Sequence, residues 1–449
     1  MSRMDGASAA ARREPAVVND VTSTDFFLGR ELLENPYPYF DALRAKCPVT
    51  KEDHHGVYMV TGYDEALEVL NDPEKFSSCT SVTGPFPGFP VPLEGDDVSA
   101  LIEEHRDALP FSDQLPTLDP PVHTQHRGLL MRLITPKRLK ENEEAMWAIA
   151  DRLLDEYLVA DSVDFIRDFA GPFTLYTIAD LLGVPPDDQE DFLYTLQRDP
   201  HRSEGNAIGS TKGDAMQENP IEFLYEKFSA YIEDRRREPR GDVLSSMAEA
   251  PFADGSQPPV RDVVAVAANL FSAGQETTVR LLSSALRVIA EQPEVQRLLR
   301  EDHSRIGNFL EEVLRTESPV KGDFRLSKVP VTVGGVDLPA GTTLMVVNGG
   351  ANRDPRKFED PSTFDPQRSN ARQHISFGRG IHTCPGAPLA RAESRVAIER
   401  LLDRTSDIRI DERVHGPAEA RVYKYVPTFV LRGLTELHLE FDPVESEAK

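Results

Sequence analysis

The segment at residues 377–386, FGRGIHTCPG, restricts the local fold of this chain more than any other. Gly378 and Gly380 permit a tight backbone turn. Cys384 and Pro385 follow, and a helical pattern then runs over 387–402. Because proline suits the first turn of a helix, Cys384 is predicted at a helix N-terminus, where backbone N–H groups and the helix dipole favour a thiolate.

The other two cysteines, Cys47 and Cys79, are far from Cys384 in sequence, and the chain has no C-x-x-C motif. This pattern argues against a disulfide framework and an all-cysteine zinc site, and it fits a reducing compartment. A lone thiolate on a glycine-rich loop suits one bond to a metal from one side, as in axial ligation of haem iron. The alternative is a buried structural thiol beside a turn.

The apolar periodicity over 261–291 predicts a long helix, roughly 46 Å in length, between Pro258-Pro259 and Pro293. It contains the polar turn AGQET at 273–277, whose glycine costs up to ~1 kcal/mol relative to alanine. Glu276 and Thr277 could relay protons, and the threonine hydroxyl could bond backwards and open the helix locally. The alternative is an ordinary solvated turn of a helix.

Helical periodicity also extends over 141–159, 172–182 and 220–237. Residues 329–333 and 336–338 indicate two strands about a double-glycine turn, and a second strand pair is predicted at 429–431 and 437–441. Helices with small peripheral β-sheets predict a mainly α, α+β architecture. We expect residues 1–20 to form a flexible N-terminal tail and residues 21–449 to form a single domain.

The segment at 84–92, GPFPGFPVP, contains too many prolines and glycines for regular helix or sheet. Long irregular segments inside compact proteins are often functional, so Phe86 and Phe89 could face a ligand. The alternative is a surface loop with two buried aromatic rings.

The chain has 75 acidic and 50 basic residues, a formal net charge of −25. This charge argues against binding to nucleic acid or to anionic lipid, since both need a basic face. No apolar stretch approaches the ~20 residues that span a bilayer, and no apolar region follows the arginines near the N-terminus. We therefore expect a cytoplasmic protein with no membrane segment.

Glu312 and Arg315 would pair on one helix face, although this spacing is common and means little alone. Its place among the other motifs gives it weight, because in their order along the chain these motifs resemble the soluble bacterial cytochromes P450. The resemblance covers roughly residues 30–442 and rests on 119–127, 273–277, 312–315, 351–355, 364–368, 377–386 and 389–393. It implies the cytochrome P450 fold, with a long central helix over a haem.

The resemblance assigns Cys384 as the proximal thiolate ligand of haem iron. The other cofactor-binding residues would be Phe377, Gly378 and Gly386 of the haem loop and, at the propionates, His123, Arg127, Arg325 and His382. The oxygen-activating turn would comprise Ala273, Gly274, Glu276 and Thr277, and a structural ion pair would join Glu312, Arg315 and Arg368. Cationic side chains suit anionic propionates. His123 and His126 could instead form a metal pair, although no third ligand is visible.

The resemblance implies a haem-thiolate monooxygenase that inserts one oxygen atom from O2 into a C–H bond, with heme b (iron protoporphyrin IX) as its cofactor. Glu276 and Thr277 would help deliver protons to the distal oxygen. Electrons would come ultimately from NAD(P)H through a separate ferredoxin and ferredoxin reductase, because no fused flavin or iron–sulfur module fits after residue 442. We expect a monomer with a local basic patch at Arg372 and Arg379 that receives the ferredoxin.

By resemblance, the substrate pocket would be lined mostly by apolar residues: Phe86, Phe89, Leu270, Ala273, Val320, Phe324, Thr428 and Phe429. Such a lining predicts a lipophilic small molecule, with terpenoids, steroids, fatty acids and aromatics all open. Lys321 or Lys424 could bind a carboxylate, or each could be a solvated lysine. Two other functions would also retain Cys384. One is a haem-thiolate isomerase or dehydratase, which the Glu276 and Thr277 pair disfavours. The other is a non-catalytic haem sensor.

Overall fold

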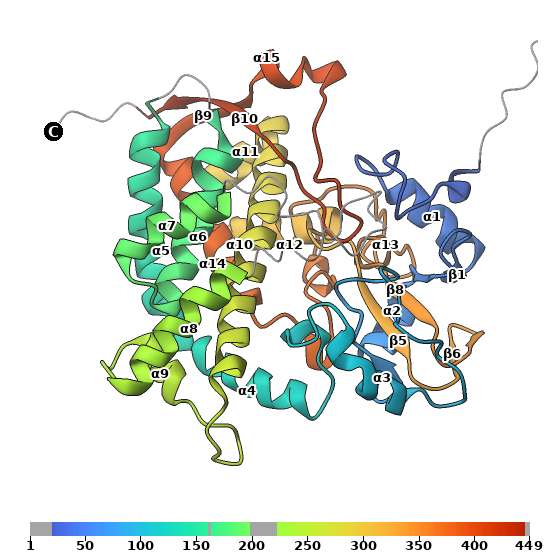
Figure 1. Ribbon diagram of the computed structural model, residues 1–449. Coiled ribbons are helices and arrows are strands. Elements are labelled where there is room, and N and C mark those ends of the chain that lie inside the picture. Colours follow the sequence, from blue (N-terminus) through green and yellow to red (C-terminus); the bar gives the residue numbers. More distant parts are fainter. Residues whose placement is uncertain (1–19, 160–162, 198–221, 445–449) are drawn as a thin grey trace, which may run out of the picture.

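The computed structural model describes residues 20–159, 163–197 and 222–444. In Figure 1, long helices fill one half of the molecule, on the left, and the larger sheet with short helices fills the other. This arrangement confirms the predicted mainly α, α+β class. Residues 1–19 of the predicted tail lie outside the described residues, while the Asp20 carboxylate accepts a hydrogen bond from the Thr22 N–H at 3.0 Å.

The longest helix is α10, Val260–Glu291, which begins one residue before the predicted start. It packs against α4 (Val122–Leu133), α6 (Gly171–Leu182), α8 (Glu222–Arg237), α12 (Ile306–Glu317) and α14 (Ala387–Arg404). Because these helices pack around it, together with α9 (Val243–Glu249) and α11 (Pro293–Glu301), most of its apolar side chains are buried. The helix therefore forms the central element of the helical half, as Figure 1 shows.

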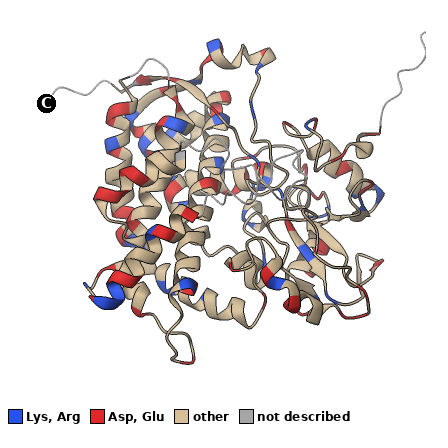
Figure 2. Ribbon diagram, viewed as in Figure 1, with Lys and Arg blue, Asp and Glu red and all other residues tan. Residues whose placement is uncertain are grey.

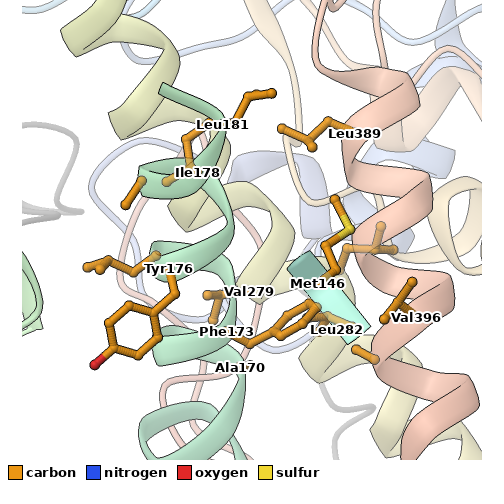
Figure 3. Close-up of a cluster of buried hydrophobic side chains, with 14 of the residues drawn as sticks. Met146, Ala170, Phe173, Tyr176, Ile178, Leu181, Val279, Leu282, Leu389 and Val396 are labelled. Carbon is orange, nitrogen blue, oxygen red and sulfur yellow. The ribbon is translucent and has the colours of Figure 1, made fainter. Parts of the chain in front are cut away.

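The main core lies where α6, α10 and α14 meet α5 (Pro136–Tyr157). Figure 3 shows Phe173 of α6 beside Val279 of α10, with its ring pointing toward Val396 of α14. Full burial of each large apolar side chain contributes about 1.5–3 kcal/mol. This packing fixes the position of α10 relative to the loop that precedes α14.

Helix α5 begins at Pro136 rather than at the predicted residue 141. The Thr135 side chain caps it by accepting a hydrogen bond from the Arg138 N–H, and Pro136 occupies the first helical position. It ends at Tyr157, two residues before the predicted end. Helix α6 ends at Leu182, and the next residue, Gly183, caps it with a φ of +72° in the left-handed region that favours glycine. The predicted helix at 220–237 is α8, and its first two residues lie outside the described part of the chain.

The largest sheet has five strands in the order β1-β2-β8-β5-β3. They are β1 (Val49–Lys51), β2 (Tyr58–Val60), β8 (Thr343–Val346), β5 (Asp323–Ser327) and β3 (Phe76–Ser77). Only β2 and β8 of these run parallel. A separate hairpin joins β6 (Val331–Val333) and β7 (Val336–Leu338), which confirms both strands about the double-glycine turn, with β6 starting after Pro330.

A three-stranded sheet has the order β4-β10-β9, from β4 (Val163–Asp164), β10 (His438–Pro443) and β9 (Thr405–Ile410). The predicted pairing of 429–431 with 437–441 is wrong, because β10 pairs with β9 and β4 instead. Leu431 makes an isolated bridge to Val320, and its N–H donates to the Thr428 hydroxyl at 2.7 Å. That local turn takes 429–431 out of any strand.

The remaining α-helices are α1 (Tyr37–Lys46), α2 (Tyr63–Leu70), α3 (Ser99–His105), α7 (Pro186–Gln197), α13 (Asn348–Ala351) and α15 (Glu412–His415). Short turns include η3 (Leu115–Thr117) and η9 (Gly380–His382). Of the helices in the described ranges, none has the length and apolar character needed to cross a membrane.

Candidate active site

The loop before α14 holds Cys384 through its backbone. The Cys384 N–H donates to the Phe377 carbonyl at 2.8 Å. Gly378 and Gly380 have φ values of +67° and +70°, and a Cβ at Gly380 would lie 2.3 Å from the Leu70 carbonyl oxygen. Any side chain there would displace α2, so the glycines predicted from the sequence are required by the turn.

Helix α14 starts at Ala387, three residues after Cys384. Its first turn contains Pro388, so the structure gives the helix-starting position to this proline rather than to Pro385. Burial raises the pKa of the Cys384 thiol, whereas backbone N–H groups of Gly386 and Ala387 lower it. The nearby Arg127 guanidinium also lowers this pKa. The thiol thus faces the donors that would stabilise a thiolate once a metal binds it.

A cavity separates Cys384 from α10. The walls contain, on the loop side, Phe377, Gly378, Cys384, Gly386 and Leu389, and on the helix side Leu270, Ala273, Gly274, Thr277 and Thr278. Arg127, Arg325 and His382 line the same cavity. The structure therefore brings together most of the residues that were predicted to act on a cofactor.

Four side chains that can carry positive charge gather beside this cavity: His123, Arg127, Arg325 and His382. The His123 and His382 rings lie 4.2 Å apart between centroids, and the His382 ring contacts the Ser78 hydroxyl at 3.0 Å. Burial and the neighbouring positive charges lower the pKa of His382 to about 2 and that of His123 to about 4. Burial also lowers the pKa of Arg325.

None of these four has a salt bridge to a carboxylate in the described ranges. The His123 Nε2 atom is buried without a hydrogen-bond partner, while Arg127 and Arg325 donate only to the backbone carbonyls of Thr383 and Phe324, each at 2.6 Å. Arg325 is buried and Arg127 is half-buried, so each guanidinium is costly without an acidic partner, and an anionic ligand would satisfy both. The cluster could therefore hold the two carboxylates of a porphyrin whose iron faces Cys384.

The acid and alcohol of the polar turn point in different directions. The Thr277 hydroxyl lines the cavity and donates to the Ala273 carbonyl at 2.7 Å, as the sequence predicted. Glu276 does not line the cavity, and its carboxylate accepts a hydrogen bond from Arg280 at 3.1 Å. Arg280 also donates to the Leu434 carbonyl at 2.7 Å. Thr277 thus lies at the cavity, whereas the Glu276 side chain lies outside its lining and is 22% exposed.

The three residues of the predicted ion pair lie together in the core. Arg315 and Glu312, both fully buried, form two hydrogen bonds at 2.7 and 2.8 Å, and Arg368 reaches the same carboxylate at 3.0 Å. The Asp365 backbone N–H also donates to Glu312 at 3.0 Å. The carboxylate therefore ties α12 to the segment that precedes the Cys384 loop.

Of the predicted pocket residues, Leu270, Ala273 and Val320 line the cavity. The structure does not place the others there: Phe86, Phe89, Phe324, Thr428 and Phe429. Phe86, Phe324 and Phe429 instead form an aromatic cluster around Phe27, with ring centroids 5.4–6.1 Å from it. Phe27 lies in an N-terminal segment whose packing partners the sequence could not reveal. Phe89 packs against His105.

The two lysines considered for a substrate carboxylate lie outside the cavity lining. Lys321 is buried, donates to the Thr428 carbonyl and has its pKa lowered by burial to about 7. Lys424 is exposed and pairs with Glu436 at 2.9 Å. His126 faces Asp262 at 3.7 Å while His123 faces His382, and no third metal ligand joins the two histidines among the described residues.

Sequence reasoning missed other cavity residues, including Ser81, Leu115 and Asn269. Asn269 left a signal, because it interrupts an apolar stretch of the long helix four residues before Ala273. That spacing places both residues on one helix face. Leu115 and Ser81 lie far away in sequence and give no local signal.

Comparisons with known proteins identify the family. The Cytochrome P450 family profile matches residues 210–406. Cytochrome P450 144 of Mycobacterium tuberculosis is 31% identical over 97% of this chain and 95% of its own, and cytochrome P450 monooxygenase PikC of Streptomyces venezuelae is 31% identical over 92% and 93%. The substrate-free structure of cytochrome P450 CYP150A6 from Mycobacterium marinum shares 52% identity with a TM-score of 0.88, over 94% of this chain and 100% of that one.

A lone thiol that faces a long central helix across a cavity, in this fold, defines a haem-thiolate enzyme. The chain belongs to the cytochrome P450 family, since its relatives align over nearly its whole length. It is a monooxygenase that uses haem and O2 and acts on small molecules.

Proposed function

We propose that the chain uses heme b, held by Cys384, to hydroxylate a C–H bond of a lipophilic small molecule. One observation carries the proposal: Cys384 and the Thr277 hydroxyl line opposite walls of a single cavity beside unpaired cationic side chains. The haem, when bound, supplies the oxygen activation and C–H oxidation. The chain's own residues bind and orient the reactants, exclude water and move protons.

On the proximal side, the N–H groups of Gly386 and Ala387 stabilise negative charge on the Cys384 sulfur. Arg127, Arg325, His123 and His382 bind the two propionates, which gives the buried His123 Nε2 atom the partner it lacks. Gly378 lines the cavity, and its φ of +67° favours glycine at this turn of the loop.

On the distal side, Glu276 takes up protons from solvent and the Thr277 hydroxyl passes them into the cavity. Glu276 suits this role because its side chain is 22% exposed and stays ordered through Arg280. Thr277 suits it because its oxygen is fixed by the Ala273 carbonyl and faces the cavity. This pair also favours the monooxygenase over an isomerase, a dehydratase or a haem sensor.

The substrate class is lipophilic, because apolar side chains dominate the distal wall: Leu115, Leu130, Leu270, Ala273, Leu281, Leu314 and Val320. Relatives 32% identical to this chain include a 6-deoxyerythronolide B hydroxylase and a vitamin D(3) 25-hydroxylase, and a solved neighbour 28% identical to this chain contains testosterone. Terpenoids and steroids are therefore the first compounds to test, followed by fatty acids and small aromatics.

Electrons reach the site from NAD(P)H through a separate ferredoxin and its reductase, with Arg372 and Arg379 as candidate contacts. The Arg372 side chain is 75% exposed and lies 3.6 Å from Glu311. Arg379 lies within the Cys384 loop and donates to the His374 carbonyl at 2.8 Å. We further propose a cytoplasmic monomer whose single catalytic domain comprises residues 21–449.

The proposal is tested by optical titration of the purified ferric protein with this panel, followed by turnover with a surrogate ferredoxin and reductase. We expect a Soret shift from the low-spin toward the high-spin position, and hydroxylated product from the compound that gives the largest shift. Normal haem content with no shift and no product across the panel would contradict the proposed activity and favour a haem sensor.

A further inference from the structure

The distal wall of the cavity contains one amide whose oxygen has no protein partner. Asn269 lines the cavity, and its Nδ2 atom donates to the Gln114 Oε1 atom at 3.2 Å. Within the described part of the chain, neither the Asn269 Oδ1 atom nor the Gln114 Nε2 atom has a hydrogen-bond partner. A polar group in this position lies among apolar neighbours such as Leu115 and Leu270.

Gln114 holds this amide in a fixed position. The Gln114 side chain is buried, and the residue precedes the short turn η3. Its N–H donates to the Phe111 carbonyl at 3.0 Å, and its own carbonyl accepts from the Thr117 N–H at 2.9 Å and hydroxyl at 2.8 Å. A rigid backbone thus supports the Gln114 amide, which in turn orients Asn269 toward the cavity.

Three other polar side chains of the cavity each make a hydrogen bond within the protein. The Ser81 hydroxyl donates to the Pro116 carbonyl at 2.7 Å, Asp323 accepts from Asn348 at 3.0 Å, and Thr277 donates to Ala273 at 2.7 Å. Asn269 therefore has an amide oxygen that a ligand can reach without breaking a hydrogen bond of the protein.

We propose that Asn269, oriented by Gln114, binds a hydroxyl group on the lipophilic substrate and so selects alcohols over the corresponding hydrocarbons. This inference rests on the proposed function. A substrate hydroxyl can donate to the Asn269 Oδ1 atom, because the Nδ2 atom of the same amide is bonded to Gln114. An unpaired hydroxyl would be penalised in so apolar a cavity, and Asn269 removes that penalty.

The position of Asn269 also sets where the substrate is oxidised. Asn269 precedes Ala273 by four residues and Thr277 by eight, which correspond to roughly 6 and 12 Å along the helix. A substrate hydroxyl bound at Asn269 would place a carbon roughly 6–12 Å away beside the oxygen-activating turn. Oxidation would then occur at a site remote from the existing alcohol.

The test compares three probes of one shape, namely cyclododecanol, its methyl ether and cyclododecane, by calorimetry and by Soret titration of the haem-loaded protein. The ether can accept a hydrogen bond but cannot donate one. We expect the alcohol to bind about 10-fold more tightly than the ether, and Asn269→Leu to reduce this ratio to about one. Cyclododecane should bind the variant at least as tightly as it binds the wild type.

Two further variants distinguish recognition from a structural role. Gln114→Leu should lower the ratio of alcohol to ether affinity by several-fold, because Asn269 loses its orientation. Ser81→Ala should leave the ratio unchanged, since that hydroxyl is already donated to a backbone carbonyl. A purely structural tie between η3 and α10 would weaken binding of all three probes equally.

The proposal is overturned if the alcohol binds no more tightly than the ether, or fails to bind, or keeps its advantage in Asn269→Leu. Failure of the underlying function gives a different result. A protein that lacked the red-shifted Soret band of a thiolate-ligated carbon-monoxide complex would contradict the haem site itself, whichever probe bound.

Discussion

Glu312 carries a charge where water has no access. Its side chain and that of Arg315 are both fully buried, and Arg368 supplies a second cationic partner. Removing one partner of such a group leaves an uncompensated charge in a medium of low dielectric constant. The arrangement therefore makes the fold around the Cys384 loop dependent on three side chains.

We expect Glu312→Gln to lower the free energy of unfolding by about 3–5 kcal/mol, measured by chemical denaturation. The matched control is Glu103→Gln, which removes the charge of an exposed glutamate three residues from Arg106, and Arg106 keeps Asp119 as a partner. That change should cost less than about 1 kcal/mol. Equal losses in the two variants would refute the importance assigned to the buried pair.

A second prediction concerns the effect of the Thr277 hydroxyl on product formation. Replacing Thr277 by alanine removes the hydroxyl that faces the cavity, so proton delivery should slow and product formation should fall by about 100-fold. Thr277→Ser should restore much of the rate, because it keeps the hydroxyl. The measurement is the amount of product formed per NAD(P)H consumed. An unchanged ratio in Thr277→Ala would show that the hydroxyl has no role in proton transfer.

Between elements, Glu311 connects α12 to α14 and to the segment before the Cys384 loop. It accepts hydrogen bonds from Arg391 at 2.6 Å and contacts the His374 ring at 3.0 Å. Burial opposes ionisation of Glu311, but the hydrogen bonds from His374 and Arg391 outweigh burial and lower its pKa to about 2. The ionised carboxylate therefore helps to hold the loop against both helices.

Because the pKa of Glu311 is lowered, its contacts with His374 and Arg391 stabilise the fold at neutral pH and lose this effect in acid. The contribution is fully present above the ordinary pKa of glutamate, near 4.5, and is lost as the pH falls toward about 2. We expect Glu311→Gln to destabilise the protein by about 2 kcal/mol at pH 7. The difference from the wild type, followed by denaturation, should shrink between pH 5 and pH 2. A difference that stayed constant with pH would contradict this assignment.

Local sequence signals located the elements that carry the site. The loop at Cys384 and the start of α14 were predictable, because glycines and prolines act within a few residues. The long helix was predicted to within one residue from its periodicity. The pairing of β10 with β4 was not predictable, because the partners lie more than 270 residues apart, at Leu439 and Val163. The same limit applied to Phe86 and Phe429, whose partner Phe27 comes from the N-terminal segment.

The negative net charge of the whole molecule does not describe the surface around Cys384, where Arg372 and Arg379 are basic. The chain has a net charge of −25, yet Figure 2 shows basic positions interspersed with acidic ones along its helices. An acidic ferredoxin would need a local basic surface, and Arg372 and Arg379 lie on the segment that surrounds Cys384. Complementary charge mainly accelerates association and is weakened by salt.

We expect the double variant Arg372→Glu, Arg379→Glu to lower ferredoxin-driven turnover about 10-fold at low ionic strength, with a smaller loss at high salt. The control is Lys424→Glu, since Lys424 is similarly exposed and paired with an acidic residue. Chemical reduction of the haem should be equally fast in both variants. Unchanged ferredoxin-driven turnover in the double variant would place the docking surface elsewhere.

The central claim is that Cys384 is the thiolate on which the haem chemistry depends. The most direct test is the absorption spectrum of the reduced carbon-monoxide complex in the wild type and in Cys47→Ser, Cys79→Ser and Cys384→Ser. We predict the red-shifted Soret band of a thiolate ligand in all but Cys384→Ser, because Cys384 lines the cavity and neither Cys47 nor Cys79 does. Retention of that band in Cys384→Ser, or its absence from haem-loaded wild-type protein, would contradict the claim.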